Sequence, residues 1–125
     1  MVAWRDILSK LLSEWKELTV VCGCRDEDAE REIAQLPREP PEEPVELSSC
    51  SACMLRELLE SSYVVQVPIS SALSESMVYV LDDCVVEISE DCGYLISKKN
   101  VSALIKVLED LGFETSALKS FLGVS

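Results

Sequence analysis

The chain has 125 residues, of which 48 % are hydrophobic, enough to form the core of one domain over residues 1–125. Its net charge is −12, from 23 acidic and 11 basic residues. This balance disfavours nucleic-acid binding, because Lys and Arg make most phosphate contacts, and it favours a protein partner with a basic surface. No apolar run is long enough to cross a bilayer and no signal-peptide pattern opens the chain, so we expect a cytoplasmic protein.

The first predicted element is an amphipathic helix over residues 3–18. Its apolar side chains recur at spacings of three and four residues, the period of one helix face. They are Trp4, Ile7, Leu8, Leu11, Leu12, Trp15 and Leu18. We interpret this stripe as part of the protein's own core, and the alternative is an interaction surface that includes Trp4 and Trp15. The β-branched residues at 18–21 then predict a short strand.

A short acidic helix is expected over residues 26–36, and a proline-rich acidic insertion follows at about 37–46. The insertion begins with the sequence PREPPEEP, which favours a stiff, extended, solvated segment. Residues 25–46 contain nine acidic and three basic residues, so they carry a net charge of −6. Glu42 and Glu43 in this segment are candidate contacts for a basic partner.

The second half of the chain predicts an α+β fold. A helix is expected from about residue 52 to residue 61, and two closing helices over 101–111 and about 115–122. Three or four strands are expected between them, with candidates at 63–69, 76–81, 84–88 and 92–97, and a further short strand is conceivable at 45–47. Acidic turns connect the later strands, so we expect an antiparallel meander, with Pro68 ending the first strand or lying on an edge.

The cysteines form the one motif with clear chemical content. Cys22-Gly23-Cys24 is a CxC motif, and Cys50-Ser51-Ala52-Cys53 is a CxxC motif at the start of a predicted helix. Two such pairs can supply four thiolates to a tetrahedral zinc ion, and a helix N-terminus stabilises thiolate charge. We therefore expect one closed site made by these four cysteines, and favour zinc as its centre.

Residues 20–60 resemble the treble-clef type of zinc finger, in which a cysteine knuckle is followed by a second pair of cysteines that opens a helix. The resemblance implies a module held together by a metal. The chain departs from that pattern in having CxC where CxxC is usual, and in lacking a clear hairpin between the two pairs. Its acidic charge also differs from that of the nucleic-acid-binding members.

Two alternatives to zinc stay open. The first is disulfide bonding, with Cys84 and Cys92 as a further candidate disulfide or as buried thiols. A hairpin around residues 89–91 would set Cys92 near Ile88, which makes a direct bond to Cys84 doubtful. The second is a thiol–disulfide oxidoreductase that uses Cys50 and Cys53 as a redox pair.

Other catalysis has little support, since the chain has no His and no glycine-rich phosphate loop. We expect a non-catalytic interaction or regulatory protein, with the oxidoreductase and a nucleic-acid-binding regulator as alternatives. A single Asn, two Gln and abundant Glu indicate a hyperthermophile. In this style the chain resembles small proteins of hyperthermophilic archaea and their viruses, and for a viral protein the cytoplasm would be the host's.

Overall fold

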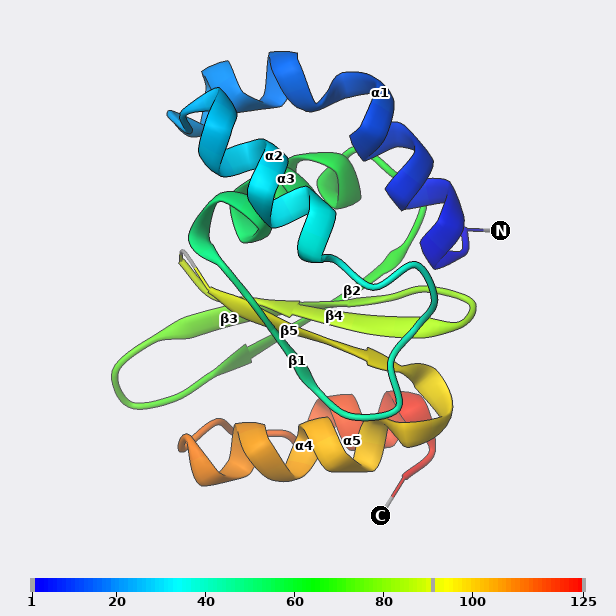
Figure 1. Ribbon diagram of the computed structural model, residues 1–125. Coiled ribbons are helices and arrows are strands. Elements are labelled where there is room, and N and C mark those ends of the chain that lie inside the picture. The colour runs from blue at the N-terminus through cyan, green and yellow to red at the C-terminus, as the bar shows by residue number, and fades with distance from the viewer. Residues whose placement is uncertain (1, 91, 125) are drawn as a thin grey trace.

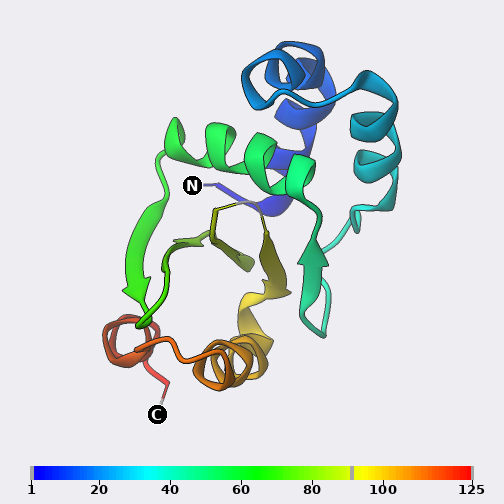
Figure 2. The same cartoon turned by 90° about the vertical axis from the view of Figure 1, so that its left-hand side faces the viewer.

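The computed structural model describes residues 2–90 and 92–124. A five-stranded antiparallel sheet forms the middle of the molecule, and helices cover both of its faces (Figures 1 and 2). The three helices of the first half of the chain lie on one face, and the two C-terminal helices lie on the other. The α+β class expected from the sequence is confirmed.

The elements follow one another along the chain with short connections, apart from the proline-rich segment before the first strand. The first helical layer consists of α1 (Trp4–Cys22), α2 (Asp26–Gln35) and α3 (Ser49–Glu60). The strands are β1 (Val45–Leu47), β2 (Val65–Ser70), β3 (Glu75–Val80), β4 (Cys84–Ile88) and β5 (Gly93–Ser97). A 3-10 turn, η1 (Lys98–Asn100), leads to α4 (Val101–Asp110) and α5 (Ser116–Leu122).

The sheet has the strand order β1-β5-β4-β3-β2. Strands β2 to β5 form the predicted meander, with Val80 opposite Val85 and Ile88 opposite Gly93 at the two successive turns. The short strand β1 pairs with β5 and completes the sheet on that side. At the other edge lies β2, which contains Pro68 as predicted and continues past it to Ser70. A proline lacks the backbone N–H, so it reduces the capacity of this edge to pair with another strand.

The alternation of side chains along the strands divides the core in two. Tyr79, Val86 and Leu95 point toward the layer of α1, α2 and α3. Val78, Val85 and Ile96, their neighbours in sequence, point toward α4 and α5. Because both faces of the sheet are covered, every residue of β4 is buried. This explains why β4 has no exposed polar position, unlike a strand with one solvated face.

The strand predicted at residues 18–21 is wrong, because this segment is the last turn of α1. Leu18 and Thr19 are buried and continue the apolar face of the helix, whereas Val20 and Val21 are 83 % and 65 % exposed. The helical penalty of β-branched residues is only about 0.5 kcal/mol each. Packing of the helix therefore decides the conformation, and the helix continues until Gly23.

Among residues 2–90 and 92–124, no helix combines the length and the apolar character needed to cross a membrane. The longest helix, α1, carries an exposed polar face along its length.

Candidate functional site: the paired disulfides

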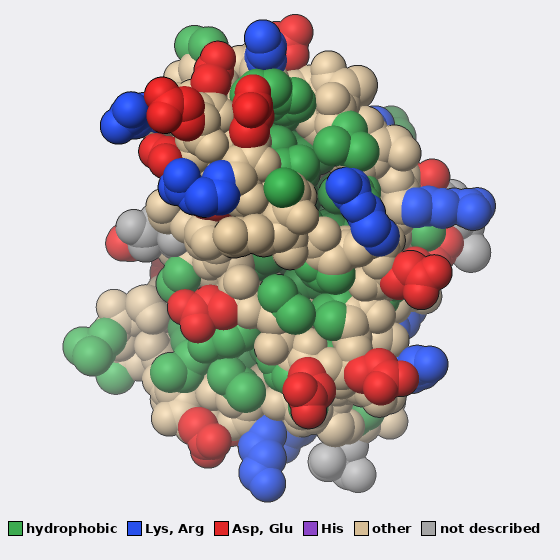
Figure 3. All heavy atoms as spheres, in the orientation of Figure 1, with side chains coloured by type: hydrophobic (Ala, Val, Ile, Leu, Met, Phe, Trp, Pro, Cys, Tyr) green, Lys and Arg blue, Asp and Glu red, His purple; other side chains and the backbone are tan. Residues whose placement is uncertain are grey.

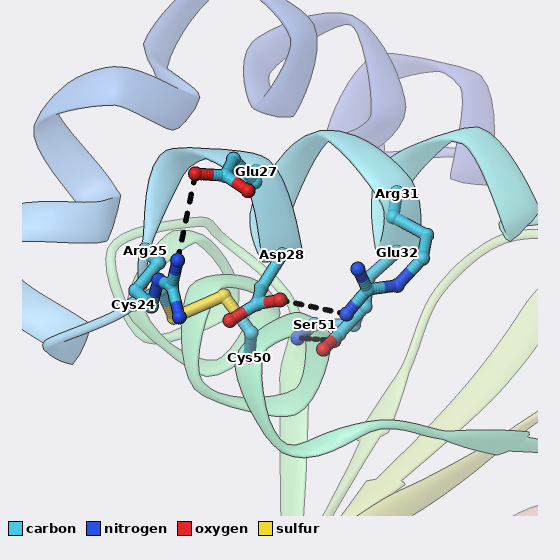
Figure 4. Close-up of polar contacts among 8 residues, drawn as sticks. All are labelled: Cys24, Arg25, Glu27, Asp28, Arg31, Glu32, Cys50 and Ser51. Atoms are coloured by element: carbon cyan, nitrogen blue, oxygen red, sulfur yellow. Dashed lines mark hydrogen bonds and ion pairs between the residues drawn. A yellow bond between two sulfur atoms is a disulfide. The ribbon is translucent and has the colours of Figure 1, made fainter.

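The four cysteines of the CxC and CxxC motifs lie together where the C-terminal end of α1 meets the N-terminal end of α3. Cys22 is bonded to Cys53, and Cys24 is bonded to Cys50, with Cα–Cα distances of 5.9 and 6.0 Å. Figure 4 shows the second of these disulfides between α2 and α3. The prediction that these four residues form one closed site is confirmed.

Local backbone geometry brings the first pair to this position. Gly23 ends α1 with a left-handed conformation, φ 67° and ψ 27°, which residues with a Cβ rarely adopt. The N–H of Cys24 then donates to the carbonyl of Thr19 at 3.0 Å, which closes the end of the helix. Gly23 is thus the C-cap of α1, and it places Cys24 directly after the end of the helix.

The second pair lies in the first two turns of α3. Ser48 is the N-cap residue, but its side chain forms no capping hydrogen bond. Glu32 of α2 caps the helix instead, because its carboxylate accepts the N–H of Ser51 at 2.8 Å (Figure 4). The acidic helix α2 is therefore joined to α3 both by a hydrogen bond at the cap and, through Cys24 and Cys50, by a disulfide.

The four cysteines line a surface hollow of about 510 Å³. Its other walls carry two cations, Arg25 and Arg56, and the carboxylates of Asp28, Glu32 and Glu90. Arg56 is held across the hollow, since its guanidinium donates to the carbonyl oxygens of Glu90 at 2.8 Å and Ser89 at 3.4 Å. Three of the cysteines are partly exposed, whereas Cys50 is only 6 % exposed. The disulfides are thus accessible from solvent, and both acidic and basic side chains surround them.

The zinc centre favoured by the sequence analysis is not what the structure has. Sulfur atoms bonded to each other cannot at the same time be the four thiolate ligands of a zinc ion. Among the described residues, no group of three or more Cys, His, Asp or Glu side chains is arranged to hold a metal ion. The sequence left disulfides as the alternative, and spacing could not decide, because both kinds of site need the same convergence of four sulfurs.

The CxxC motif also differs from a redox pair. Cys50 and Cys53 belong to two separate disulfides, each with a partner in the CxC motif. In a thioredoxin-type site the two cysteines of the motif form a disulfide with each other. Here the motif serves to join two segments of the chain.

The remaining two cysteines take no part in the site. Cys84 is fully buried at the start of β4, and burial, followed by the nearby Asp83, raises the pKa of its thiol far above the usual range. Cys92 is exposed and precedes β5. Because Cys84 pairs with Ser97 and Ile88 with Gly93, the two cysteines are at opposite ends of the β4–β5 hairpin. This register rules out the direct disulfide that the sequence analysis already doubted.

Most of the apolar stripe of residues 3–18 belongs to the core, as we interpreted it, but Leu12 is 48 % exposed. Trp4 is fully buried, and its indole Nε1 donates to the carbonyl of Pro37 at 2.9 Å, while its backbone N–H donates to the Asp83 carboxylate at 2.9 Å. Trp4 is therefore not part of an exposed interaction surface. Trp15 is half-buried against the same core. Glu42 and Glu43, the other candidate contacts, are exposed.

Sequence reasoning missed a buried acid, Glu87, in the middle of β4. Its carboxyl group pairs with the hydroxyl of Ser76 and accepts the hydroxyl of Ser89 at 2.9 Å. Burial raises the pKa of Glu87, and the two serine hydrogen bonds partly oppose this shift. The alternation of side chains along the strand could have indicated that Glu87 is buried, because Glu87 is two residues after Val85 and lies on the same face of the sheet.

Comparison of the chain with protein-family models, with curated proteins and with solved structures finds no match.

Proposed function

We propose that this chain is a non-catalytic interaction protein that binds a partner with a basic surface through its acidic segment, residues 25–46. The observation that carries the proposal is the position of the disulfides, which close both ends of this segment. Cys22 and Cys24 precede it, and Cys50 and Cys53 follow it. The segment holds a net charge of −6, half of the net charge of the chain.

The acidic segment has little apolar anchoring of its own. Within it, Ala29, Ile33 and Leu36 are its buried apolar residues, and most of the rest is exposed or half-buried. An isolated helix as short as α2, ten residues, is marginal in water. The disulfides and the bond from Glu32 to Ser51 therefore give α2 a fixed position. A charged surface that is already ordered avoids most of the entropy loss that binding would otherwise impose on it.

Much of the negative charge in the segment is open to solvent. Glu30, Glu39, Glu42 and Glu43 are exposed. The three ion pairs among the described residues are Arg25–Glu27, Arg31–Asp28 and Lys119–Glu109, so they leave these four carboxylates out. Figure 3 shows several acidic side chains over the part of the molecule where α2 and the end of α1 lie, with Lys and Arg side chains among them. Such a field attracts a basic partner over about 10 Å at 0.1 M salt.

The alternatives have weaker support. A thiol–disulfide oxidoreductase would use Cys50 and Cys53 together, and these residues are bonded to different cysteines. A nucleic-acid-binding regulator would need a basic face, and the chain has 11 basic residues against 23 acidic ones. The oxidised chain, in which all four cysteines are in disulfides, has no thiolates to offer to zinc.

Two variants of equal charge test the proposal. E30Q/E39Q/E42Q/E43Q removes four carboxylates from the acidic segment, and E14Q/E17Q/E75Q/D110N removes four exposed carboxylates from α1, β3 and α4. A photoreactive amino acid is introduced at Pro41 of the segment, and separately at Ser102 of α4, in the cell of origin. We expect a cross-linked basic protein from Pro41 that is lost with the first variant and retained with the second.

Equal loss in both variants would show that only total charge matters and would contradict a defined acidic surface. Cross-linking from Ser102 but not from Pro41 would place the binding surface on the opposite side of the sheet. Raising the salt concentration from 0.05 to 0.5 M in vitro, with the captured protein as the probe, should slow association through Debye screening.

A further inference from the structure

We propose that reduction converts the two disulfides into a metal site, in which the thiolates of Cys22, Cys24, Cys50 and Cys53 bind one zinc-type divalent cation. The inference rests on the common position of the four sulfurs in one hollow and does not depend on the partner proposed above. It differs from the zinc centre expected from sequence, because the metal belongs to the reduced chain and the disulfides to the oxidised chain.

The electron balance of the conversion is simple. Each disulfide takes two electrons and two protons from a dithiol, and the dithiol is itself oxidised to a disulfide. Two dithiols therefore yield four thiols in the hollow. On binding zinc, the four thiols release four protons and form four Zn–S bonds, with no further change in oxidation state. Three of the four cysteines are partly exposed, so a reductant can reach both bonds.

Contacts other than the disulfides also bring the four cysteines together. Leu11 and Leu18 of α1 and Leu55 and Leu58 of α3 belong to the same buried cluster, so apolar packing joins the two helices in addition to the disulfides. The hydrogen bond from Ser51 N–H to Glu32 holds α2 on α3 independently of the disulfides. The ends of the helices that carry the cysteines are thus positioned by apolar and polar contacts that reduction leaves in place.

The distances suit a tetrathiolate. Zn–S bonds of about 2.3 Å in a tetrahedron set the sulfurs about 3.8 Å apart. The bonded cysteines have Cα–Cα distances of 5.9 and 6.0 Å, so side-chain rotation is enough to separate their sulfurs without moving the helices apart. Within each motif, only one or two residues separate the two cysteines, so the two sulfurs of one motif also stay close to each other.

The charges around the hollow also suit this centre. A zinc ion with four thiolates has a net charge of −2, and Arg25 and Arg56 both line the hollow. Cys50 lies in the first turn of α3, where the helix dipole stabilises a thiolate. Of the carboxylates in the rim, Asp28 is paired with Arg31, and Glu32 accepts a backbone N–H. The carboxylates of Asp28, Glu32 and Glu90 oppose thiolate formation and attract the cation.

As a consequence, the same four cysteines would cross-link the two ends of the acidic segment under both oxidising and reducing conditions. Under oxidising conditions the two disulfides join α1 to α3 and close the acidic segment. Under reducing conditions a single metal ion bound by the same four residues would close the same segment. The position of α2 would then stay fixed although the bonds that hold it are exchanged.

Cobalt binding to the reduced protein tests the inference. The C92S variant removes the exposed cysteine outside the site, and Cys84 stays buried in the core. A phosphine reduces the disulfides and becomes a phosphine oxide, with water supplying the oxygen and the protons, and is then removed under argon. We expect one Co²⁺ per chain, with sulfur-to-cobalt charge-transfer bands and the visible bands of a tetrahedral ion, and displacement by one equivalent of Zn²⁺.

Two controls make the result decisive. The oxidised C92S protein should give none of these bands, and C53S in the C92S background should lose the four-sulfur spectrum after reduction. If the reduced protein unfolds, one equivalent of Zn²⁺ should restore its native tryptophan fluorescence. A reduced protein that binds no cobalt, that binds it equally with and without Cys53, or that stays unfolded with zinc would overturn the inference.

Discussion

The two disulfides are expected to stabilise the fold in a strongly non-additive way. They join the same two segments, and one is nested inside the other, with sequence separations of 31 for Cys22–Cys53 and 26 for Cys24–Cys50. The perturbations are C22A/C53A, C24A/C50A and the quadruple variant. Alanine is used because it is small and apolar, like a buried cysteine side chain.

The magnitude follows from the entropy of loop closure in the unfolded chain. In the chain-entropy model a first disulfide that closes 31 residues contributes about 3.7 kcal/mol, and one that closes 26 residues contributes about 3.5 kcal/mol. Once either disulfide is present, the other closes only the small ring formed by the CxC and CxxC spacers, roughly five residues of chain. This second closure contributes about 2 kcal/mol in the same model.

Each double variant should therefore lose about 2 kcal/mol of unfolding free energy, and the quadruple variant between about 5 and 6 kcal/mol. The loss in the quadruple variant exceeds twice that of either double variant, because the last disulfide to be removed is the one that closes the long loop. Such a loss is comparable to the whole stability of many domains of about this size.

Urea unfolding without reductant measures these differences. The two tryptophans provide the fluorescence signal, since Trp4 is buried and Trp15 is half-buried in the core that the disulfides adjoin. A loss in the quadruple variant that equals the sum of the losses in the two double variants would refute the nested-loop reasoning. So would a quadruple variant that is as stable as the natural chain, because it would show that neither bond constrains the unfolded state.

Three further changes test other parts of the structure. W4F removes the indole donor to the Pro37 carbonyl and should cost about 1–3 kcal/mol of unfolding free energy, whereas W15F, at a half-buried site, should cost less in the same urea assay. The pKa of Glu87 is raised above its ordinary value of 4.5, so its contribution to stability is full below that value and is lost as the pH rises through the folded-state pKa. E87Q should therefore lose less stability than the natural chain as the pH rises, in thermal melts at a series of pH values, and a pH-independent difference would show that Glu87 has the same pKa in the folded and the unfolded protein. G93A adds a Cβ directly against the backbone carbonyl of Glu87 and should cost about 1–3 kcal/mol or more, visible as a lower melting temperature, while an unchanged melting temperature would mean that the β4–β5 hairpin can shift at no cost.

Much of the fold was predictable from local patterns. The periodicity from Trp4 to Leu18 and the alternation in the meander depend on neighbours in sequence, so they predicted those elements within a few residues. The prediction for residues 18–21 was wrong, because their β-branched side chains indicated a strand, whereas burial of Leu18 and Thr19 extended the helix. Strand β1 was barely visible in the sequence, since a three-residue strand is stabilised by its pairing with β5 and not by its own composition.

The sequence by itself predicted that four cysteines converge and that they enclose half of the net charge, because spacing and charge are properties of the chain alone. It could not determine how the sulfurs are bonded, since zinc and disulfides require the same convergence. The tertiary structure decided that the two motifs bond to each other, Cys22 to Cys53 and Cys24 to Cys50. It also decided that Glu32 caps α3 and that Trp4 is buried, because each depends on which distant segments the packing of the helices on the sheet brings within a few ångströms.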